Sequence, residues 1–343
     1  MSLHVIGVCW RMLDINDFSK KQIVCFFPAK GEKISYKNDN MVITDKDGCI
    51  KYQHTCYRIF MLIVIGDVSL TTGIIKRAAK FGFSICFMSY GFRIYSVINA
   101  GMQGNTLLHK KQYLYNETGL AQTIIKNKIQ NQKQLLLRIR NKSEFTKEGI
   151  ELLENYITQL SFTELTREKI LGYEGNASRV YFARIFDNVN WKGRKPRIKF
   201  DYVNSLLDIG YTLLFNFIDS ILQVFGFDVY CGVLHTCFYM RKSLVCDIVE
   251  PFRPIIDWRV RIGINLKQFS KEDFVKINNQ WQLNYSKSSV YANIFMTDLL
   301  NNKESIFLYI RSYYRAFMKG LDCYKFPNFN IKDGLVIMPE EEV

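Results

Sequence analysis

The sequence predicts an α+β protein in which a small domain of β-strands precedes a larger helical domain. Short runs rich in Ile, Val and Phe fill the first hundred of 343 residues, and clusters of Gly, Asp and Asn separate them. After "NAGMQGN" at 99–105, apolar residues instead recur three and four positions apart. We therefore predict a β domain over 1–104 and an all-helical domain over 105–343.

The strands of the first domain are expected in short apolar runs bounded by turn-forming residues such as "KNDN" and "DKDG". One helix is expected over 69–82, where "SLTTGIIKRAAKFG" begins at Ser and Thr caps and ends at Gly82. The predicted strands are "KQIVCFF" at 21–27, "MVITD" at 41–45, "FMLIVIG" at 60–66, "FSICFMS" at 83–89 and "RIYSVIN" at 93–99.

The second domain shows helical periodicity throughout, and we expect no further strands in it. The stretch from Tyr211 to Met240 carries only two charged residues, Asp219 and Asp228. Polar residues nevertheless interrupt every 20-residue window of it, which favours buried core helices over a membrane span. The helical segments lie at 106–117, 120–142, 146–160, 162–186, 201–226, 242–264 and 304–321.

Positive charge is concentrated in the first 200 residues. The net charge is +6 over 1–100, +9 over 101–200 and −1 over 201–343, for a total of +14. A basic region of this size favours a polyanionic partner, above all a nucleic acid. A generally lysine-rich composition is the simpler alternative. No glycine-rich phosphate loop or dinucleotide fingerprint points to a nucleotide-dependent enzyme.

The nine cysteines form no CxxC pair, and most lie in apolar runs. "CIKYQHTC" and "CGVLHTC" combine Cys with His but lack a second ligand pair at zinc spacing. The start, "MSLHVIGVCWRMLD", does not match a secretory signal. We expect reduced thiols, a cytoplasmic location and no membrane association.

The stretch "GYEGNAS" at 172–178 places Glu174 among very small side chains within a predicted helix. Two glycines in a helix interior cost about 1 kcal/mol each relative to alanine. One explanation is that small residues clear the helix surface so that a bulky ligand can reach the carboxylate. The other is that they let a second helix pack closely, which would leave Glu174 exposed.

A second acidic stretch, "GVLHTCFYMRKSLVCDIVEPFRP", contains His235, Asp247 and Glu250. The two acids are three residues apart on one face of an otherwise apolar helix, where a solvated edge is a poor explanation. Together with Glu174, an imidazole and these carboxylates form a competent ligand set for a divalent cation. Carboxylates suit Mg²⁺ or Mn²⁺, and the imidazole favours Mn²⁺.

Between these stretches lies a basic loop, "NWKGRKPRIKF", with a tryptophan and no acidic residue. Most charge runs are solvated loops, but this one is a better candidate than average for contacts to phosphates. Its cations are Lys192, Arg194, Lys195, Arg197 and Lys199.

In this order, "GYEGNASRVYFARIF", "RKPRIKFDYVNSLLDIGYTLL" and "GVLHTCFYMRKSLVCDIVEPFRP" resemble the CRISPR spacer-acquisition integrase family. "LIVIGDVSLTTGIIKRAAKFGFSICFMS" and "GNTLLHKKQY" are similar to its β-domain and linker segments. The resemblance covers roughly residues 55–260. One departure is His109, where the family pattern has arginine before "KKQY".

The resemblance implies a β-sandwich-like N-terminal domain that dimerises, a helical catalytic domain, and assembly with a small ferredoxin-like CRISPR-associated protein. It implies that Glu174, His235 and Glu250 are catalytic metal ligands, and that Asp247, which matches the acidic position beside the last of them, is a further candidate ligand. The implied reaction inserts prespacer DNA into the CRISPR repeat beside its leader, by attack of a 3′-hydroxyl on a phosphodiester. DNA endonuclease activity and a location in the cytoplasm of a prokaryotic cell are also implied.

Arg241 and Lys242, together with the basic loop, would then position phosphates. Two alternatives remain: a DNA-binding scaffold without catalysis, in which the acids are structural, and a metal-dependent nuclease that cuts DNA without joining it. Dependence on a divalent metal separates the scaffold from the enzymes, and joining separates the integrase from the nuclease.

Overall fold

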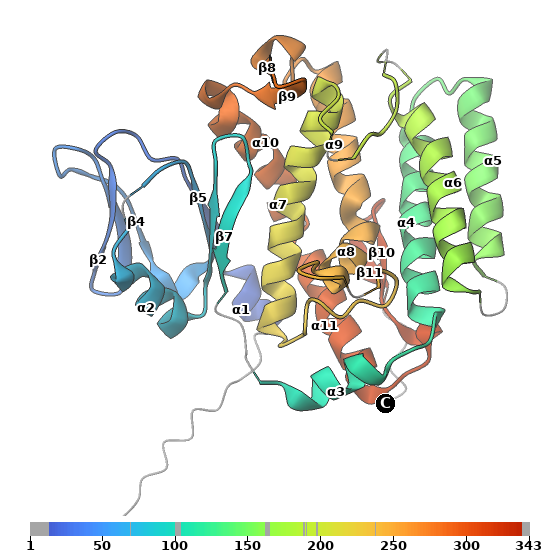
Figure 1. Ribbon diagram of the computed structural model, residues 1–343, viewed down its shortest axis with the longest axis horizontal. Coiled ribbons are helices and arrows are strands. Elements are labelled where there is room, and N and C mark those ends of the chain that lie inside the picture. The colour runs from blue at the N-terminus through green and yellow to red at the C-terminus, as the bar shows by residue number, and fades with distance from the viewer. Residues whose placement is uncertain are drawn as a thin grey trace, which may run out of the picture.

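The computed structural model describes residues 14–68, 70–99, 104–161, 165–187, 189, 191–196, 198–236 and 238–337. Two β-sheets form the N-terminal part, and helices form most of the remainder (Figure 1). One sheet has the order β1-β5-β6-β7, in which β7 alone runs antiparallel to its neighbour. The other is the antiparallel sheet β2-β3-β4. Their strands are β1 (Gln22–Phe26), β2 (Lys33–Lys37), β3 (Asn40–Thr44), β4 (Ile50–Thr55), β5 (Ile59–Ile65), β6 (Ser84–Met88) and β7 (Ile94–Ile98).

The two sheets enclose a hydrophobic cluster that also includes residues of α2 (Thr72–Phe81). This arrangement confirms the β-sandwich-like domain and all five predicted strands. Sequence periodicity missed β2 and β4, because "KISYK" and "IKYQHT" leave most of their side chains partly or fully exposed. Neither strand therefore shows the apolar run on which the predictions relied.

Strand β5 is buried along its whole length, "IFMLIVI", because both of its faces are covered. Leu62 and Val64 belong to the cluster between the sheets. Met61, Ile63 and Ile65 belong to the large core that the sheet shares with the helices. The two parts of the chain thus share a hydrophobic core.

The second part has an outer bundle of α4, α5 and α6 and a central helix, α7, that lies between this bundle and the β-sheets (Figure 1). The short helix α1 (Ile15–Ser19) packs against α11 through the stacked rings of Phe18 and Phe307. The remaining helices are α3 (Thr106–Leu114), α4 (Gly119–Arg138), α5 (Glu144–Gln159), α6 (Arg167–Ile185), α7 (Tyr202–Val224), α8 (Ser243–Val249), α9 (Arg253–Asn265), α10 (Ser288–Asn301) and α11 (Lys303–Lys319).

The expectation that this part is all-helical was wrong in one respect, because two short hairpins interrupt it. They are β8 (Phe274–Ile277) with β9 (Gln280–Leu283), and β10 (Asn328–Asn330) with β11 (Leu335–Ile337). Strands of three or four residues are too short to show alternation. The turn Asn278-Asn279, where both residues have positive φ, is typical of a two-residue hairpin and was the overlooked signal.

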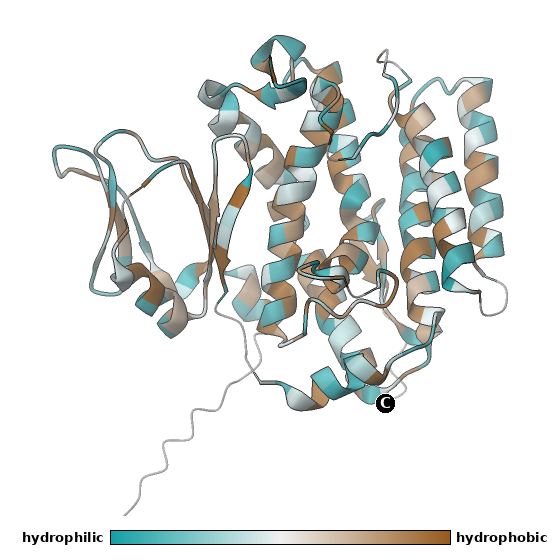
Figure 2. Ribbon diagram, in the orientation of Figure 1, coloured by the Kyte–Doolittle hydropathy of each residue, from teal (hydrophilic) through white to brown (hydrophobic). Residues whose placement is uncertain are grey.

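Helix α7 is long and apolar enough to cross a membrane by length and composition. However, 83% of its apolar window is buried inside the fold, as expected for a core helix. Hydrophobic residues (brown) recur along it in the middle of the molecule (Figure 2). The ring of Phe217 on α7 meets Phe60 of β5 edge-on at 5.9 Å, which joins the helix to the sheet.

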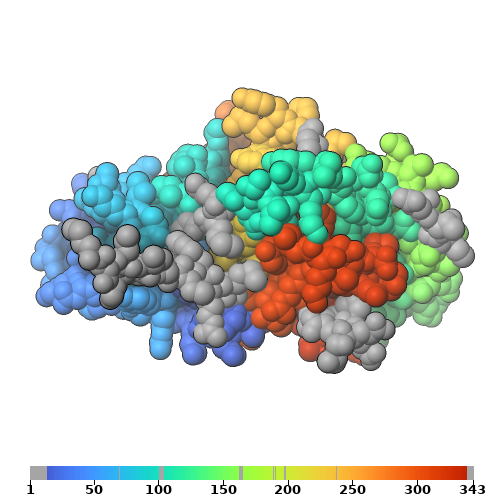
Figure 3. All heavy atoms as spheres, turned by 90° about the horizontal axis from the view of Figure 1, so that it is seen from below, coloured from blue at the N-terminus to red at the C-terminus, as the bar shows by residue number. Residues whose placement is uncertain are grey.

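Helix α3 follows the predicted domain boundary and lies across one face of the molecule beside α11 (Figure 3). Lys111 of α3 donates a hydrogen bond to the carbonyl of Met318 on α11. His109 places Nε2 3.0 Å from the carbonyl of Gly226, so its imidazole makes a backbone contact. This contact shows one use of the histidine that departs from the family pattern.

Candidate functional site

A cavity of about 1390 Å³ opens between α4, α6, α7, the start of α9 and the basic loop. Its lining includes seven Lys or Arg residues and four Asp or Glu residues. The cations exceed the acids, so the cavity can take up a polyanion. The seven cations are Arg93, Lys128, Arg179, Lys192, Arg194, Lys199 and Arg253.

Glu174 lies on α6 and lines this central cavity. Its carboxylate accepts a hydrogen bond from Ser178 Oγ at 3.0 Å, one turn further along the helix. It also forms an ion pair with Lys128, which projects from α4. Because 26% of the Glu174 side chain stays exposed, the carboxylate remains accessible from the cavity.

The glycines around Glu174 face open space. A Cβ added at Gly172 or Gly175 would meet no atom within 4 Å, and Gly175 lines the cavity. Close packing of another helix therefore does not explain them, in contrast to Gly149 on α5, where an added Cβ would overlap Arg184. The observation favours the other interpretation, in which small residues leave room for a ligand beside Glu174.

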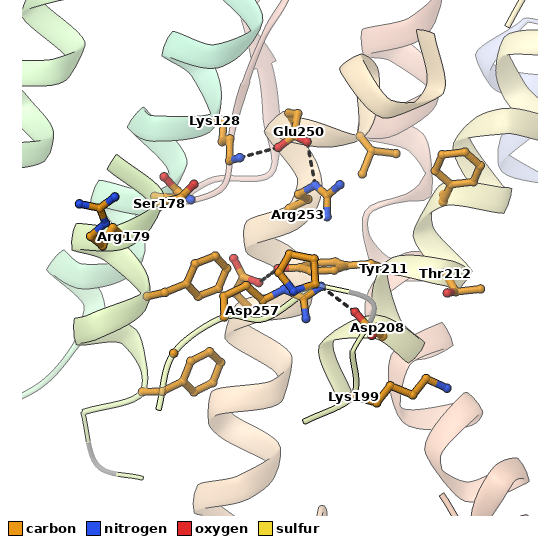
Figure 4. A pocket seen from close by; sticks show the side chains of 18 of the residues that line it. Lys128, Ser178, Arg179, Lys199, Asp208, Tyr211, Thr212, Glu250, Arg253 and Asp257 are labelled. Carbon is orange, nitrogen blue, oxygen red and sulfur yellow. Dashed lines mark hydrogen bonds and ion pairs between the residues drawn. The ribbon is translucent and has the colours of Figure 1, made fainter. Parts of the chain in front are cut away.

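Glu250 begins the 3₁₀ turn Glu250–Phe252 that joins α8 to α9, and its side chain is 8% exposed. Arg253 Nε donates to Oε1 at 3.0 Å, and Lys128 Nζ lies 2.6 Å from Oε2 (Figure 4). Burial opposes ionisation of Glu250, but Arg253 and Lys128 outweigh it and hold the pKa at about 2. Glu250 is therefore a carboxylate at neutral pH.

His235 lies in the loop before α8, and Asp247 of α8 organises this loop. Asp247 accepts hydrogen bonds from the backbone N–H groups of Val233, Leu234 and His235, and lies 2.6 Å from His235 Nδ1. An added Cβ at position 232 would lie 2.6 Å from Asp247 Oδ2, so the close approach of the loop requires glycine there.

This geometry gives Asp247 an orienting role. Both of its oxygens bind the loop, whereas the imidazole of His235 keeps Nε2 for another partner. His235 lies close enough to Glu250 to influence the ionisation of that carboxylate. The arrangement thus counts against Asp247 as a direct ligand and supports it as the residue that orients His235.

No group of three His, Cys, Asp or Glu side chains in the described part of the chain is arranged to hold a metal ion. Instead, the ammonium of Lys128 contacts both Glu174 and Glu250. The acidic pair is nevertheless suited to a cation: Glu250 Oε2 is buried and has no partner in hydrogen-bond geometry, although Lys128 lies beside it. Two carboxylates with an imidazole nearby are appropriate donors for Mg²⁺ or Mn²⁺.

The predicted phosphate contacts divide into two groups. Lys192, Arg194 and Lys199 line the cavity, although Arg194 already pairs with Asp208 at 2.6 Å. Lys195 stacks on the ring of Phe200 at 4.0 Å. Arg197 lies outside the described residues.

The other two predicted contacts lie near the His235 loop. Lys242 Nζ is 2.6 Å from Asp219, which is fully buried, so its charge is already compensated within the protein. This ion pair favours a structural role for Lys242 over a phosphate contact. Arg241 is partly buried, and its Nε has no hydrogen-bond partner.

Sequence reasoning missed six charged residues of the cavity: Arg93, Lys128, Arg179, Asp208, Arg253 and Asp257. A faint signal for Lys128 was present, because "NKIQNQ" places polar residues on the inner face of an otherwise amphipathic helix. Asn127 and Asn131, on the same helix, are buried and bind the backbone of Phe329 in β10. Polar side chains that face a core indicate either hydrogen bonds to buried backbone groups, as here, or a functional site.

Comparison with known proteins gives a consistent assignment. The family model described as "CRISPR associated protein Cas1" matches residues 27–296, which is most of the chain. The CRISPR-associated endonuclease Cas1 1 of Thermodesulfovibrio yellowstonii is 30% identical over 227 residues, covering 63% of this chain and 71% of the relative.

Solved structures share the fold. A casposase bound to integration product aligns with a TM-score of 0.73 at 20% identity, over 94% of this chain and 97% of that one. A chain of a Cas6-RT-Cas1–Cas2 complex aligns with a TM-score of 0.74 at 20% identity, over 88% of this chain but only 35% of that longer one. From the extent of the family match, this chain belongs to the Cas1 family of CRISPR-associated proteins.

Proposed function

We propose that this chain is the metal-dependent integrase of CRISPR adaptation, which joins the 3′-hydroxyl ends of prespacer DNA to the CRISPR repeat. One observation carries the proposal: Glu174 and Glu250, which are 76 positions apart in the sequence, both contact the ammonium of Lys128. All three residues line the cavity, which is rich in Lys and Arg. The relative's name as a Cas1 endonuclease and the casposase's integration product are consistent with this chemistry.

The proposed reaction is a transesterification. The 3′-hydroxyl oxygen attacks a phosphorus of the repeat, a new P–O bond forms, and the bond to the repeat's own 3′ oxygen breaks. That oxygen leaves with a proton as a new 3′-hydroxyl, so phosphodiester bonds are conserved and no external energy source is needed. A direct displacement of this kind requires no nucleophilic side chain and no covalent link between protein and DNA.

Glu174 and Glu250, with Nε2 of His235, are the residues that would hold a divalent cation. When bound, Mg²⁺ or Mn²⁺ would lower the pKa of the attacking hydroxyl and neutralise charge on the phosphoryl group. Arg253 keeps Glu250 ionised and in place. Asp247 fixes the orientation of the imidazole through Nδ1.

Other residues of the cavity would bind the DNA. Gly175 leaves open space beside Glu174, through which a DNA backbone can approach. Arg179 and Lys192 line the same cavity and have charge to offer phosphates. We also propose a homodimer through the N-terminal domain and a small ferredoxin-like partner; the neighbouring Cas1–Cas2 complex is consistent with a partner of this kind.

The test is a strand-transfer assay with purified protein, Mg²⁺ or Mn²⁺, a short duplex with 3′-hydroxyl ends and a supercoiled plasmid carrying a repeat, with and without the partner. Glu174→Ala should reduce joining by at least about a hundredfold, because the acidic pair would be lost. Glu154→Gln is the control, since Glu154 pairs with Lys133 on the outer face of the bundle.

The same assay separates the alternatives. Metal-dependent cutting without joining would identify a nuclease, and metal-independent DNA binding without either reaction would identify a scaffold. Wild-type joining by Glu174→Ala would refute the assignment of the site.

A further inference from the structure

We propose that Lys128 is a built-in counter-ion that holds Glu174 and Glu250 together in the metal-free protein and must leave them when a divalent cation binds. The inference rests on the proposed metal site, but it concerns how this chain keeps that site ready. It assigns a positioning role to a lysine that lies on neither of the acidic segments.

The geometry of Lys128 sets it apart from the other cations of the cavity. Its ammonium contacts Oε1 of Glu174 on α6. It also lies 2.6 Å from Oε2 of Glu250 before α9 (Figure 4). Its side chain projects from a third element, α4, and is only 6% exposed. One buried cation therefore links three segments that are distant in the sequence.

Charge balance explains this placement. Two carboxylates brought together without a cation would repel each other and resist burial. Lys128 and Arg253 together match the charge of Glu174 and Glu250, so the metal-free cluster is neutral. A divalent ion added to this cluster would leave two excess positive charges in a largely buried site.

The same oxygens cannot serve both cations fully. Mg²⁺ requires oxygens at about 2.0–2.1 Å and strict geometry, whereas Lys128 Nζ already lies 2.6 Å from Glu250 Oε2. The ammonium is the group free to move, because it ends a flexible four-carbon stem. Lys128 and Gln132, one turn away on α4, both border the cavity, so a released ammonium stays within reach of a phosphate there.

Metal affinity then depends on how often Lys128 vacates the acidic pair. A ligand that binds only a minor state has its apparent affinity reduced by the population of that state. Removing the ammonium should therefore tighten metal binding, although it weakens the metal-free fold. A purely structural lysine would produce only the second effect.

The first experiment measures Mn²⁺ binding by isothermal titration calorimetry, and thermal stability without metal, for wild type and Lys128→Met. Methionine is an uncharged residue of similar length. We expect a lower Tm without metal and Mn²⁺ binding about tenfold tighter. Lys133→Met is the matched control, because Lys133 lies on the same helix and pairs with Glu154 away from the cavity.

The second experiment uses the wild-type chain and does not depend on the folding of a variant. Amine acetylation with mass spectrometry reports the accessibility of each lysine with and without Mn²⁺. We expect Mn²⁺ to increase labelling of Lys128 several-fold and to leave Lys133 unchanged.

Mn²⁺ binding to Lys128→Met that is no tighter than to wild type, or labelling of Lys128 that does not respond to Mn²⁺, would overturn the inference. If wild type still catalyses metal-dependent joining in that case, the proposed function stands without it. If wild type neither binds Mn²⁺ nor joins DNA, both proposals fail.

Discussion

Asp257 shows how surroundings set the charge of a single residue at the edge of the cavity. It lies on α9, is almost fully buried, and accepts hydrogen bonds from the hydroxyls of Tyr181 and Tyr211. Burial raises its pKa to about 6, although the two tyrosines and Arg253 favour the charged form. Glu250 shows the opposite outcome, because its cations are in direct contact with it.

This difference predicts a specific pH dependence of stability. A carboxyl whose pKa is raised on folding stabilises the native state most at low pH, and this contribution disappears as pH rises through about 6. Between pH 4 and 7 the free energy of unfolding should fall by up to roughly 3 kcal/mol through Asp257 alone. Asp257→Asn, which does not titrate, should remove this slope in urea unfolding followed by tryptophan fluorescence. An unchanged slope in the variant would show that Asp257 is charged throughout.

At the scale of elements, the two glycines of α6 lower the stability of the helix but leave open space on its surface. Gly172 and Gly175 are helical, face open space and lie one turn apart, but only Gly175 lines the cavity. Helix propensity alone would favour larger residues at both positions. The comparison of the two positions therefore isolates the role of the space itself.

We expect Gly175→Met to raise the free energy of unfolding by about 0.5–1 kcal/mol, because methionine is a better helix former than glycine. The same change should weaken DNA binding about tenfold, since the new side chain projects into the cavity. Gly172→Met should bring a similar gain in stability with little effect on DNA. Urea unfolding and fluorescence anisotropy with a duplex carrying 3′-hydroxyl ends measure both quantities, and equal DNA affinity of the two variants would contradict this explanation.

The extent to which sequence predicted the site differs between elements. Glu174 and Glu250 could be found because each interrupts a local pattern, a small-residue run in one case and an apolar helix in the other. Lys128 could not be assigned in this way, since a lysine on an amphipathic helix is ordinary until its neighbours are known. Lys242 is the converse case: it lies in a basic pair, but the tertiary fold places it against the buried Asp219.

At the scale of the whole molecule, sequence predicted the order of the two parts but not how they join. The uninterrupted apolar run of β5 is typical of a strand covered on both faces, but it does not identify the elements that cover it. The structure shows both faces covered, with Met61 and Ile63 in the same core as α7. Contacts between segments so distant in the chain leave no local signature.

This shared core predicts that the β-sheets and the helices unfold together. Ile63→Ala removes methyl groups from a side chain that is 1% exposed, and should lower the free energy of unfolding by about 2–4 kcal/mol. Ile50→Ala on β4, where the side chain is 59% exposed, is the control and should change it by less than about 0.5 kcal/mol. In a Trp10→Phe background, fluorescence of the other three tryptophans, Trp191, Trp258 and Trp281, reports on the helical part. Hydrogen exchange of β5 and β6 amides reports on the sheet. In Ile63→Ala both transitions should shift together, because the space left by the removed methyl groups lies in the core that the sheet shares with the helices. A tryptophan transition that stays in place while the strands lose protection would show that the N-terminal domain unfolds independently.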